Sequence, residues 1–132
     1  MKVAFLTGGG NAPCLAASIG RLIKNYSEAD PAIEMIGYLH GYKGLLSGKF
    51  ITISKDVIDA AEILYEFGGS PIGNSRVKLS NIEDCYKNNY IKKGQVPIEI
   101  AAKQLVKDKI NILHTIGGDD TNTTAADLVN YL

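Results

Sequence analysis

Residues 110–122, INILHTIGGDDTN, place two glycines and two adjacent aspartates directly after an apolar run. The apolar run predicts a buried strand, and the residues from Asp119 onward predict a helix. A similar pattern stands near the start of the chain, where an apolar run over residues 2–6 precedes Gly8-Gly9-Gly10. Glycine turns before a helix are typical of phosphate sites, because their backbone N–H groups can face an anion. Two carboxylates in such a turn need an explanation, since they repel an anion.

Apolar strand-like runs alternate with helix-like segments along the whole chain. Further strands are expected at residues 33–39 and 50–53, and further helices at residues 12–26, 54–67, 81–92 and 97–107. Asn11 is the expected N-cap of the first helix, with Pro13 in its first turn. We interpret the glycine-rich stretch 41–48 as a loop. The order predicts an α/β fold of three layers, in which helices cover both faces of a mostly parallel sheet.

Composition restricts the class of protein. A chain of 132 residues with 45% hydrophobic residues is long enough for one globular domain with a core. Fourteen basic and fourteen acidic residues cancel, so the sequence offers no broad basic field for nucleic acid or an anionic membrane. No apolar run is long enough for a membrane span or a signal peptide, and we expect a cytoplasmic protein. Cys14 and Cys85 form no CxxC pair, so free thiols are expected rather than a zinc site.

Two common nucleotide motifs do not fit the glycine turns. The dinucleotide pattern requires glycine or alanine at position 13, where Pro13 stands, and an acidic residue after the second strand, which ends in Tyr38-Leu39. The Walker pattern requires Ser or Thr at position 50, where Phe50 stands. Two separate glycine turns at the carboxyl edge of one parallel sheet remain, and such an edge is where ligands bind.

Each candidate site residue also has a purely structural interpretation. Asp119 is a possible helix N-cap, and it is equally able to hold Mg²⁺. Thr121 can stabilise the first helical turn or offer its hydroxyl to a phosphate. Arg76 can be a solvated charge or a forked phosphate donor, and Lys78 has the same two interpretations with a weaker case. His114, amid apolar residues of a predicted strand, is expected to be a core histidine.

Three segments together resemble the nucleotide-site motifs of the phosphofructokinase family, in the order in which the family carries them. They are residues 5–13 (FLTGGGNAP), 68–76 (GGSPIGNSR) and 116–122 (IGGDDTN). The resemblance covers nearly the whole chain. It implies the Rossmann-like donor domain of a phosphofructokinase, incomplete here, and transfer of a phosphoryl group to fructose 6-phosphate with Mg²⁺ as cofactor. It also implies a homo-oligomer, either a dimer or a tetramer, in the complete glycolytic enzyme.

The second aspartate of the third motif resembles the branch of the family that uses pyrophosphate. ATP-dependent members have glycine at this position, which leaves room for the α-phosphate of the nucleotide. The carboxylate of Asp120 would fill that room, and like charges a few ångströms apart cost on the order of several kcal/mol at an effective dielectric of about 20. Pyrophosphate has no third phosphorus centre to place there. Asp120 is therefore expected to select pyrophosphate over ATP.

The resemblance also implies roles for individual residues. Gly9 and Gly10 would bring backbone N–H groups to the phosphates, and Gly118 would allow close approach. Arg76 would stabilise the charge of the transferred group. Asp119 would hold Mg²⁺, and Thr121 would bond to the phosphate side of the site.

The family's general base lies in a TIDND-like motif, which does not occur before Leu132. We therefore expect residues 1–132 to form the N-terminal part of the donor domain and to be inactive alone. The alternatives are a non-catalytic phosphate-binding module and an ATP-dependent phosphofructokinase that tolerates Asp120.

Overall fold

A mixed four-stranded sheet forms the centre of the computed structural model, which describes residues 1–10, 14–66 and 68–132. Its strands are β1 (Lys2–Thr7), β2 (Glu34–Tyr38), β3 (Phe50–Thr52) and β4 (Ile112–Ile116), and their order across the sheet is β3-β2-β1-β4. β1 runs parallel to both β2 and β4, whereas β3 runs antiparallel to β2. The prediction of a mostly parallel sheet is confirmed.

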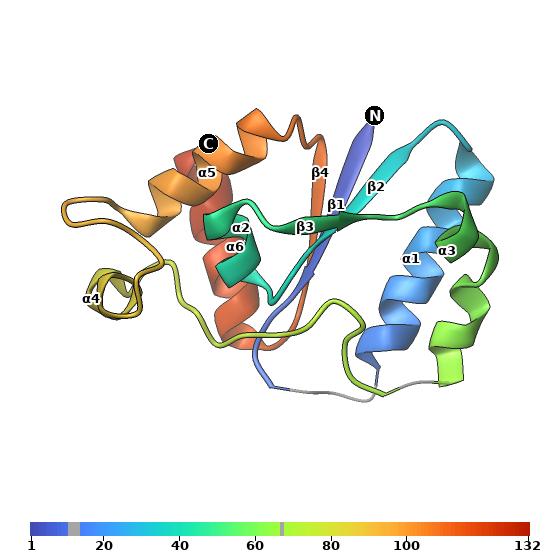
Figure 1. Ribbon diagram of the computed structural model, residues 1–132, viewed down its shortest axis with the longest axis horizontal. Helices are drawn as coiled ribbons and strands as arrows, with labels where there is room; N and C mark the ends of the chain where they lie inside the picture. Colours follow the sequence, from blue (N-terminus) through green and yellow to red (C-terminus); the bar gives the residue numbers. More distant parts are fainter. Residues whose placement is uncertain (11–13, 67) are drawn as a thin grey trace.

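Helices cover both faces of the sheet, as predicted (Figure 1). One face carries α1 (Leu15–Ala29), α3 (Lys55–Asp59) and the 3₁₀ helix η1 (Ala61–Glu66). The other face carries α2 (Tyr42–Ser47), α5 (Pro97–Lys107) and α6 (Asp119–Tyr131), and the short α4 (Ile82–Lys87) lies farther out beyond them.

The two faces of β1 bury alternate side chains into two separate cores. Val3 and Phe5 pack with residues of α1 such as Ile19. Ala4 and Leu6 pack with residues of α2, α5 and α6, among them Leu45, Leu105 and Leu128. Each of these four β1 side chains is fully buried. A central parallel strand covered on both sides has this continuous apolar pattern, and it explains why residues 3–6 contain no polar residue.

The order of the strands determines where the two glycine turns lie. From β1 the chain moves to β2 on one side, and it later returns to β4 on the other side of β1. The carboxyl ends of β1 and β4 therefore meet at a reversal of strand order, where parallel α/β sheets bind ligands. Both glycine turns leave the sheet at this edge.

Several predicted boundaries were wrong. Residues 42–47 form α2 rather than a loop, because Leu45 and Leu46 are buried there and Gly48, at φ 69°, caps the helix. The predicted helix over residues 54–67 is divided into α3 and η1, although Ser54 does cap its start. The predicted helix over residues 81–92 ends at Lys87, and Asn89 takes a positive φ of 62°. Asn11 and Pro13 lie outside the described residues.

No helix among the described residues is both long enough and apolar enough to cross a membrane.

Candidate functional site

The first and third motifs lie side by side at the carboxyl edge of the sheet. Thr7 pairs with Ile116 across β1 and β4, and the backbone N–H of Gly8 donates to the carbonyl oxygen of Ile116 at 2.9 Å. The glycine turns that follow these residues are therefore neighbours in space. The sequence predicted that both turns lie at this edge of the sheet. The structure adds that β1 and β4 are adjacent strands.

The first residues of α6 pack tightly between the two turns. The side chain of Thr121 lies against Gly8 and Gly117, and a Cβ on Gly117 would come within 2.6 Å of Thr121 Oγ1. The Tyr42 hydroxyl, from α2, donates to the carbonyl oxygen of Thr121 at 2.8 Å. Burial raises the pKa of Tyr42 well above its usual range, so this donor keeps its proton at any ordinary pH. The start of α6 is thus held by steric fit and by a buried hydrogen bond.

The loop that contains the second motif brings Arg76 to the first turn. The backbone N–H of Gly9 donates to the carbonyl oxygen of Ser75 at 2.9 Å. Gly9 itself takes a positive φ of 76°, which favours glycine at this position. A Cβ on Gly10 would lie 2.7 Å from Arg76 Nη2, so the guanidinium occupies the space beside Gly10.

Every site residue that the sequence predicted lines one hollow of about 680 Å³. Its lining includes Gly9, Gly10, Arg76, Gly118, Asp119, Asp120 and Thr121. Cys14 and Leu15, at the start of α1, also line it. The Cys14 thiol is exposed, whereas Cys85 lies in the core and burial raises the pKa of its thiol. Both cysteines are free.

The bond from Gly9 to Ser75 changes the role that we expected for Gly9. Its N–H already donates to the loop carbonyl of Ser75. The conformation of Gly9 instead turns the chain and leaves open space beside its Cα, where a ligand can approach. The N–H of Gly10 remains the predicted phosphate contact of this turn.

Asp119 and Asp120 begin α6, and both are exposed. Negative charge at a helix N-terminus interacts favourably with the helix dipole. Lys78 Nζ lies 3.2 Å from Asp120 Oδ2, and both residues line a smaller hollow of about 190 Å³ that also includes Gly9, Arg76 and Thr121. Such an exposed ion pair stabilises a fold little. The sequence had left Lys78 with two interpretations, and no motif indicated this partner.

The residues of the 680 Å³ hollow could hold Mg²⁺ only together with further ligands. Residues 1–10, 14–66 and 68–132 contain no cluster of three or more His, Cys, Asp and Glu side chains that could hold a metal ion alone. Mg²⁺ commonly binds one or two carboxylates and takes its other ligands from water and substrate phosphates. The adjacent carboxylates of Asp119 and Asp120, which line the hollow beside the glycine turns, agree with that arrangement.

His114 lies outside this site. Its Nε2 lies 2.6 Å from the Tyr26 hydroxyl, and its ring stacks on Phe5 with centroids 5.8 Å apart. The prediction of a satisfied core histidine is confirmed, although the side chain is only partly buried.

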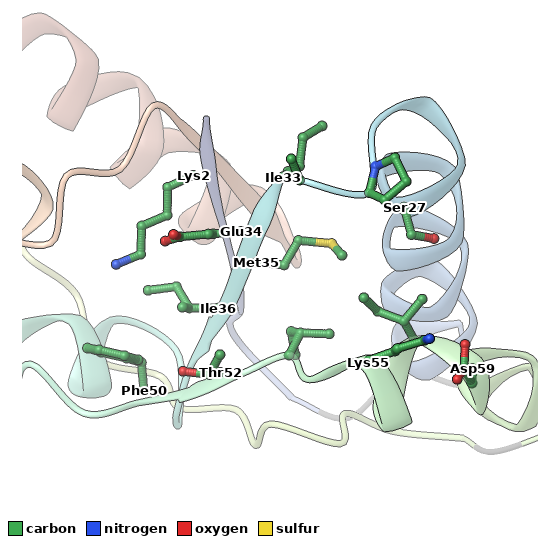
Figure 2. Close-up of a pocket in the computed structure, with 14 residues that line it drawn as sticks. Lys2, Ser27, Ile33, Glu34, Met35, Ile36, Phe50, Thr52, Lys55 and Asp59 are labelled. Atoms are coloured by element: carbon green, nitrogen blue, oxygen red, sulfur yellow. The ribbon is translucent and has the colours of Figure 1, made fainter.

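A second large hollow, of about 640 Å³, lies at the opposite edge of the sheet, around the first residues of β1 and β2 (Figure 2). Lys2, Glu34, Met35 and Phe50 are among the residues that line it. None of the predicted site residues lies there. The predicted site residues are therefore concentrated at the edge with the glycine turns.

Comparison with known proteins agrees with this geometry. The family description "Phosphofructokinase" matches residues 2–132. The chain belongs to the phosphofructokinase family. The pyrophosphate–fructose 6-phosphate 1-phosphotransferase of Methylotuvimicrobium alcaliphilum is 57% identical over 99% of this chain, and that match covers 32% of the relative. The protein of the same name from Mastigamoeba balamuthi is 53% identical over 98% of the chain.

More distant relatives include ATP-dependent and pyrophosphate-dependent phosphofructokinases. The ATP-dependent 6-phosphofructokinase 2 of Clostridium perfringens is 32% identical over 96% of the chain. A pyrophosphate-dependent phosphofructokinase structure from Marinobacter aquaeolei superposes with a TM-score of 0.78 at 21% identity, covering 99% of this chain and 30% of that one. At this identity the likeness shows the fold. The chain spans about a third of the length of the curated relatives that it matches.

Proposed function

We propose that residues 1–132 form the N-terminal part of the pyrophosphate-binding domain of a pyrophosphate-dependent 6-phosphofructokinase. The parent protein would transfer a phosphoryl group from Mg-pyrophosphate to fructose 6-phosphate, giving fructose 1,6-bisphosphate in a reversible step of glycolysis. The observation that carries this proposal is the place of Asp120. Its carboxylate lines the same hollow as Gly10 and Arg76, where it would meet a third phosphate group of a nucleotide. Relatives at 53–58% identity are named as pyrophosphate enzymes, which supports the same choice.

The described residues can bind and orient the phosphoryl donor. Gly10 would present its N–H to a phosphate, while Gly9 and Gly118 would permit close approach. Thr121 would bond to the phosphate side of the site. Arg76, an exposed side chain on the rim of the hollow, would pair with phosphate oxygens and stabilise the charge that develops during transfer.

Asp119 would hold Mg²⁺ together with phosphate oxygens. The bound ion would neutralise charge on the phosphates during transfer. Asp120 would reduce the space for a nucleotide, and Lys78 would offset part of its charge. The two adjacent carboxylates thus have different proposed roles.

The acceptor hydroxyl of the sugar also requires a general base. Among the described residues that line the hollow, the carboxylates are Asp119 and Asp120, and both already have proposed roles. We propose that a part of the parent protein outside residues 1–132 supplies this base, as the family resemblance implies. We further propose a cytoplasmic homo-oligomer for the complete enzyme.

The proposal is tested by assaying the full-length protein that contains this chain. Fructose 6-phosphate and Mg²⁺ are supplied with either pyrophosphate or ATP at equal concentrations, and fructose 1,6-bisphosphate is measured. Rapid product formation with pyrophosphate and slow formation with ATP is the expected result. Preferential use of ATP would contradict the proposal. Pyrophosphate binding without turnover by either donor would indicate the non-catalytic module instead.

A further inference from the structure

The loop that contains Arg76 needs an anchor. Residues 68–76 include Gly68, Gly69 and Gly73, and none of these loop residues that the structure describes lies in a helix or strand. Gly69 and Gly73 take positive φ values of 71° and 79°. Such a segment is flexible by composition, yet a charge-stabilising side chain must be held within about half an ångström of its productive place. Contacts from the rigid sheet would hold such a loop in place.

Thr7, the last residue of β1, reaches this loop with its hydroxyl. Thr7 Oγ1 lies 2.7 Å from Ser70 Oγ, 2.9 Å from the carbonyl oxygen of Gly73 and 2.8 Å from Asn74 Oδ1. The side chain of Thr7 is fully buried. The hydroxyl donates its one proton to the Gly73 or the Asn74 oxygen, and it can accept a proton from the Ser70 hydroxyl. A single buried group thus contacts three loop residues.

Thr7 also stands where the other two motifs meet. It pairs with Ile116, which immediately precedes the Gly117 turn, and it immediately precedes Gly8. Its backbone therefore sets the place of both glycine turns, while its hydroxyl sets the place of the loop that ends in Arg76. The backbone bond from Gly9 to Ser75 fastens the same loop one residue before Arg76.

We propose that Thr7 is a positioning residue, whose hydroxyl holds the 70–74 part of the loop so that Arg76 stays beside Gly10. This inference rests on the proposed function of Arg76. It assigns no contact between Thr7 and a ligand, because the Thr7 side chain is buried beneath the loop. Its consequence is that loss of the hydroxyl disturbs Arg76 without changing any residue of the hollow.

Thr7→Val removes the hydroxyl and keeps the branched shape, and Thr7→Ser keeps the hydroxyl and removes the methyl group. Both variants are made in the full-length protein, with Thr52→Val on the exposed strand β3 as the matched control. With pyrophosphate as donor, Thr7→Val should lower kcat by about tenfold or more, since small displacements of a catalytic group are costly. Thr7→Ser should restore most of the activity, and Thr52→Val should behave as the wild type.

A double variant separates positioning from general damage. If Thr7 acts through Arg76, Thr7→Val should lower kcat little further in an Arg76→Ala background. If Thr7→Val lowers kcat by the same factor in the wild type and in the Arg76→Ala background, the inference is overturned. Wild-type kcat in Thr7→Val would overturn it as well.

Amide hydrogen exchange of residues 68–76, measured without ligand, gives a readout that does not depend on catalysis. Exchange should be faster in Thr7→Val than in the wild type and near normal in Thr7→Ser. If the wild-type protein proves not to use pyrophosphate, the proposed function fails, and this exchange measurement still decides whether Thr7 anchors the loop. Unchanged exchange would overturn the anchor. If Thr7→Val does not fold, Ser70→Ala removes one loop partner without altering the strand, and faster exchange with lower kcat is expected there too.

Discussion

Arg76 lies against Gly10 so closely that a Cβ at position 10 would come within 2.7 Å of the guanidinium Nη2. The two residues belong to different motifs, and the contact joins the charged group of the loop to the first glycine turn. Gly10 therefore provides the space in which the Arg76 side chain rests. A side chain at position 10 would therefore fit only if the Arg76 side chain moved.

Gly10→Ala should reduce activity much more than stability. The added methyl group meets the far end of a flexible side chain, so Arg76 can move away at little cost to folding. We expect pyrophosphate-dependent kcat to fall by about tenfold, because the displaced guanidinium would no longer face the transferred phosphoryl group in the proposed role of Arg76. Thermal unfolding and steady-state kinetics of the full-length variant check both parts. A loss of kcat that persists undiminished in an Arg76→Ala background would show that Gly10 acts in another way.

Lys78→Met should weaken pyrophosphate binding without weakening the fold. Lys78 Nζ lies 3.2 Å from Asp120 Oδ2, and its removal leaves the Asp120 charge uncompensated beside an anion. We expect KM for pyrophosphate to rise several-fold at low ionic strength, with a smaller rise at high salt because salt screens the repulsion. The ion pair is exposed, so the free energy of unfolding should change by less than about 1 kcal/mol. Lys78→Arg is the matched control and should retain most of the affinity.

Gly44→Ala should destabilise the protein. Gly44 lies in α2, and a Cβ there would run into the backbone of Leu39, including its carbonyl oxygen. Because backbone cannot move aside as a flexible side chain can, the overpacking should cost at least about 1–3 kcal/mol. Chemical unfolding of the full-length variant measures this cost. Wild-type stability would mean that α2 can shift relative to the end of β2.

Stability should depend on the protonation of His114. Burial lowers the pKa of His114, and the Tyr26 hydroxyl lies 2.6 Å from its Nε2. The unfolded chain binds the proton at its ordinary pKa of about 6.5, whereas the folded chain binds it only at lower pH. The contribution of His114 to the free energy of unfolding therefore does not change above about pH 7, and it falls as the pH decreases below about 6.5.

His114→Gln keeps a neutral polar group at this position, and it should remove this part of the pH dependence. Urea unfolding between pH 5 and pH 8 compares the two proteins. Parallel pH profiles would show that His114 makes no contribution.

Local patterns predicted those parts of the fold that depend on neighbouring residues. The helix predicted at residues 97–107 is α5 with the same bounds, because Pro97 begins it and apolar residues recur on one face. The apolar run predicted β4, and the glycine turn that follows it predicted the start of α6 at Asp119. The common edge of the two glycine turns followed from parallel strand pairing, whereas the adjacency of β1 and β4 is seen only in the structure.

Contacts between distant segments could not be predicted in the same way. The glycines of 41–48 suggested a loop, but Gly44 is where a helix approaches the backbone of Leu39, so the glycine permits packing. The N–H of Gly9 was predicted to face a phosphate, and only the structure shows that Ser75 accepts it. The contacts of Thr7 with the loop and of Lys78 with Asp120 likewise depend on the tertiary fold, and no sequence spacing indicates them.

The measurement that tests the central claim most directly is the donor preference of Asp120 variants in the full-length protein. The ratio of kcat/KM for ATP to kcat/KM for pyrophosphate is compared in the wild type, Asp120→Asn and Asp120→Gly. Asn keeps the size of the side chain and removes its charge, whereas Gly removes both. If the Asp120 carboxylate excludes the nucleotide, the ratio should rise in Asp120→Asn and rise further, by about tenfold or more over the wild type, in Asp120→Gly. An unchanged ratio in Asp120→Gly would contradict the assignment of Asp120 as the residue that selects pyrophosphate.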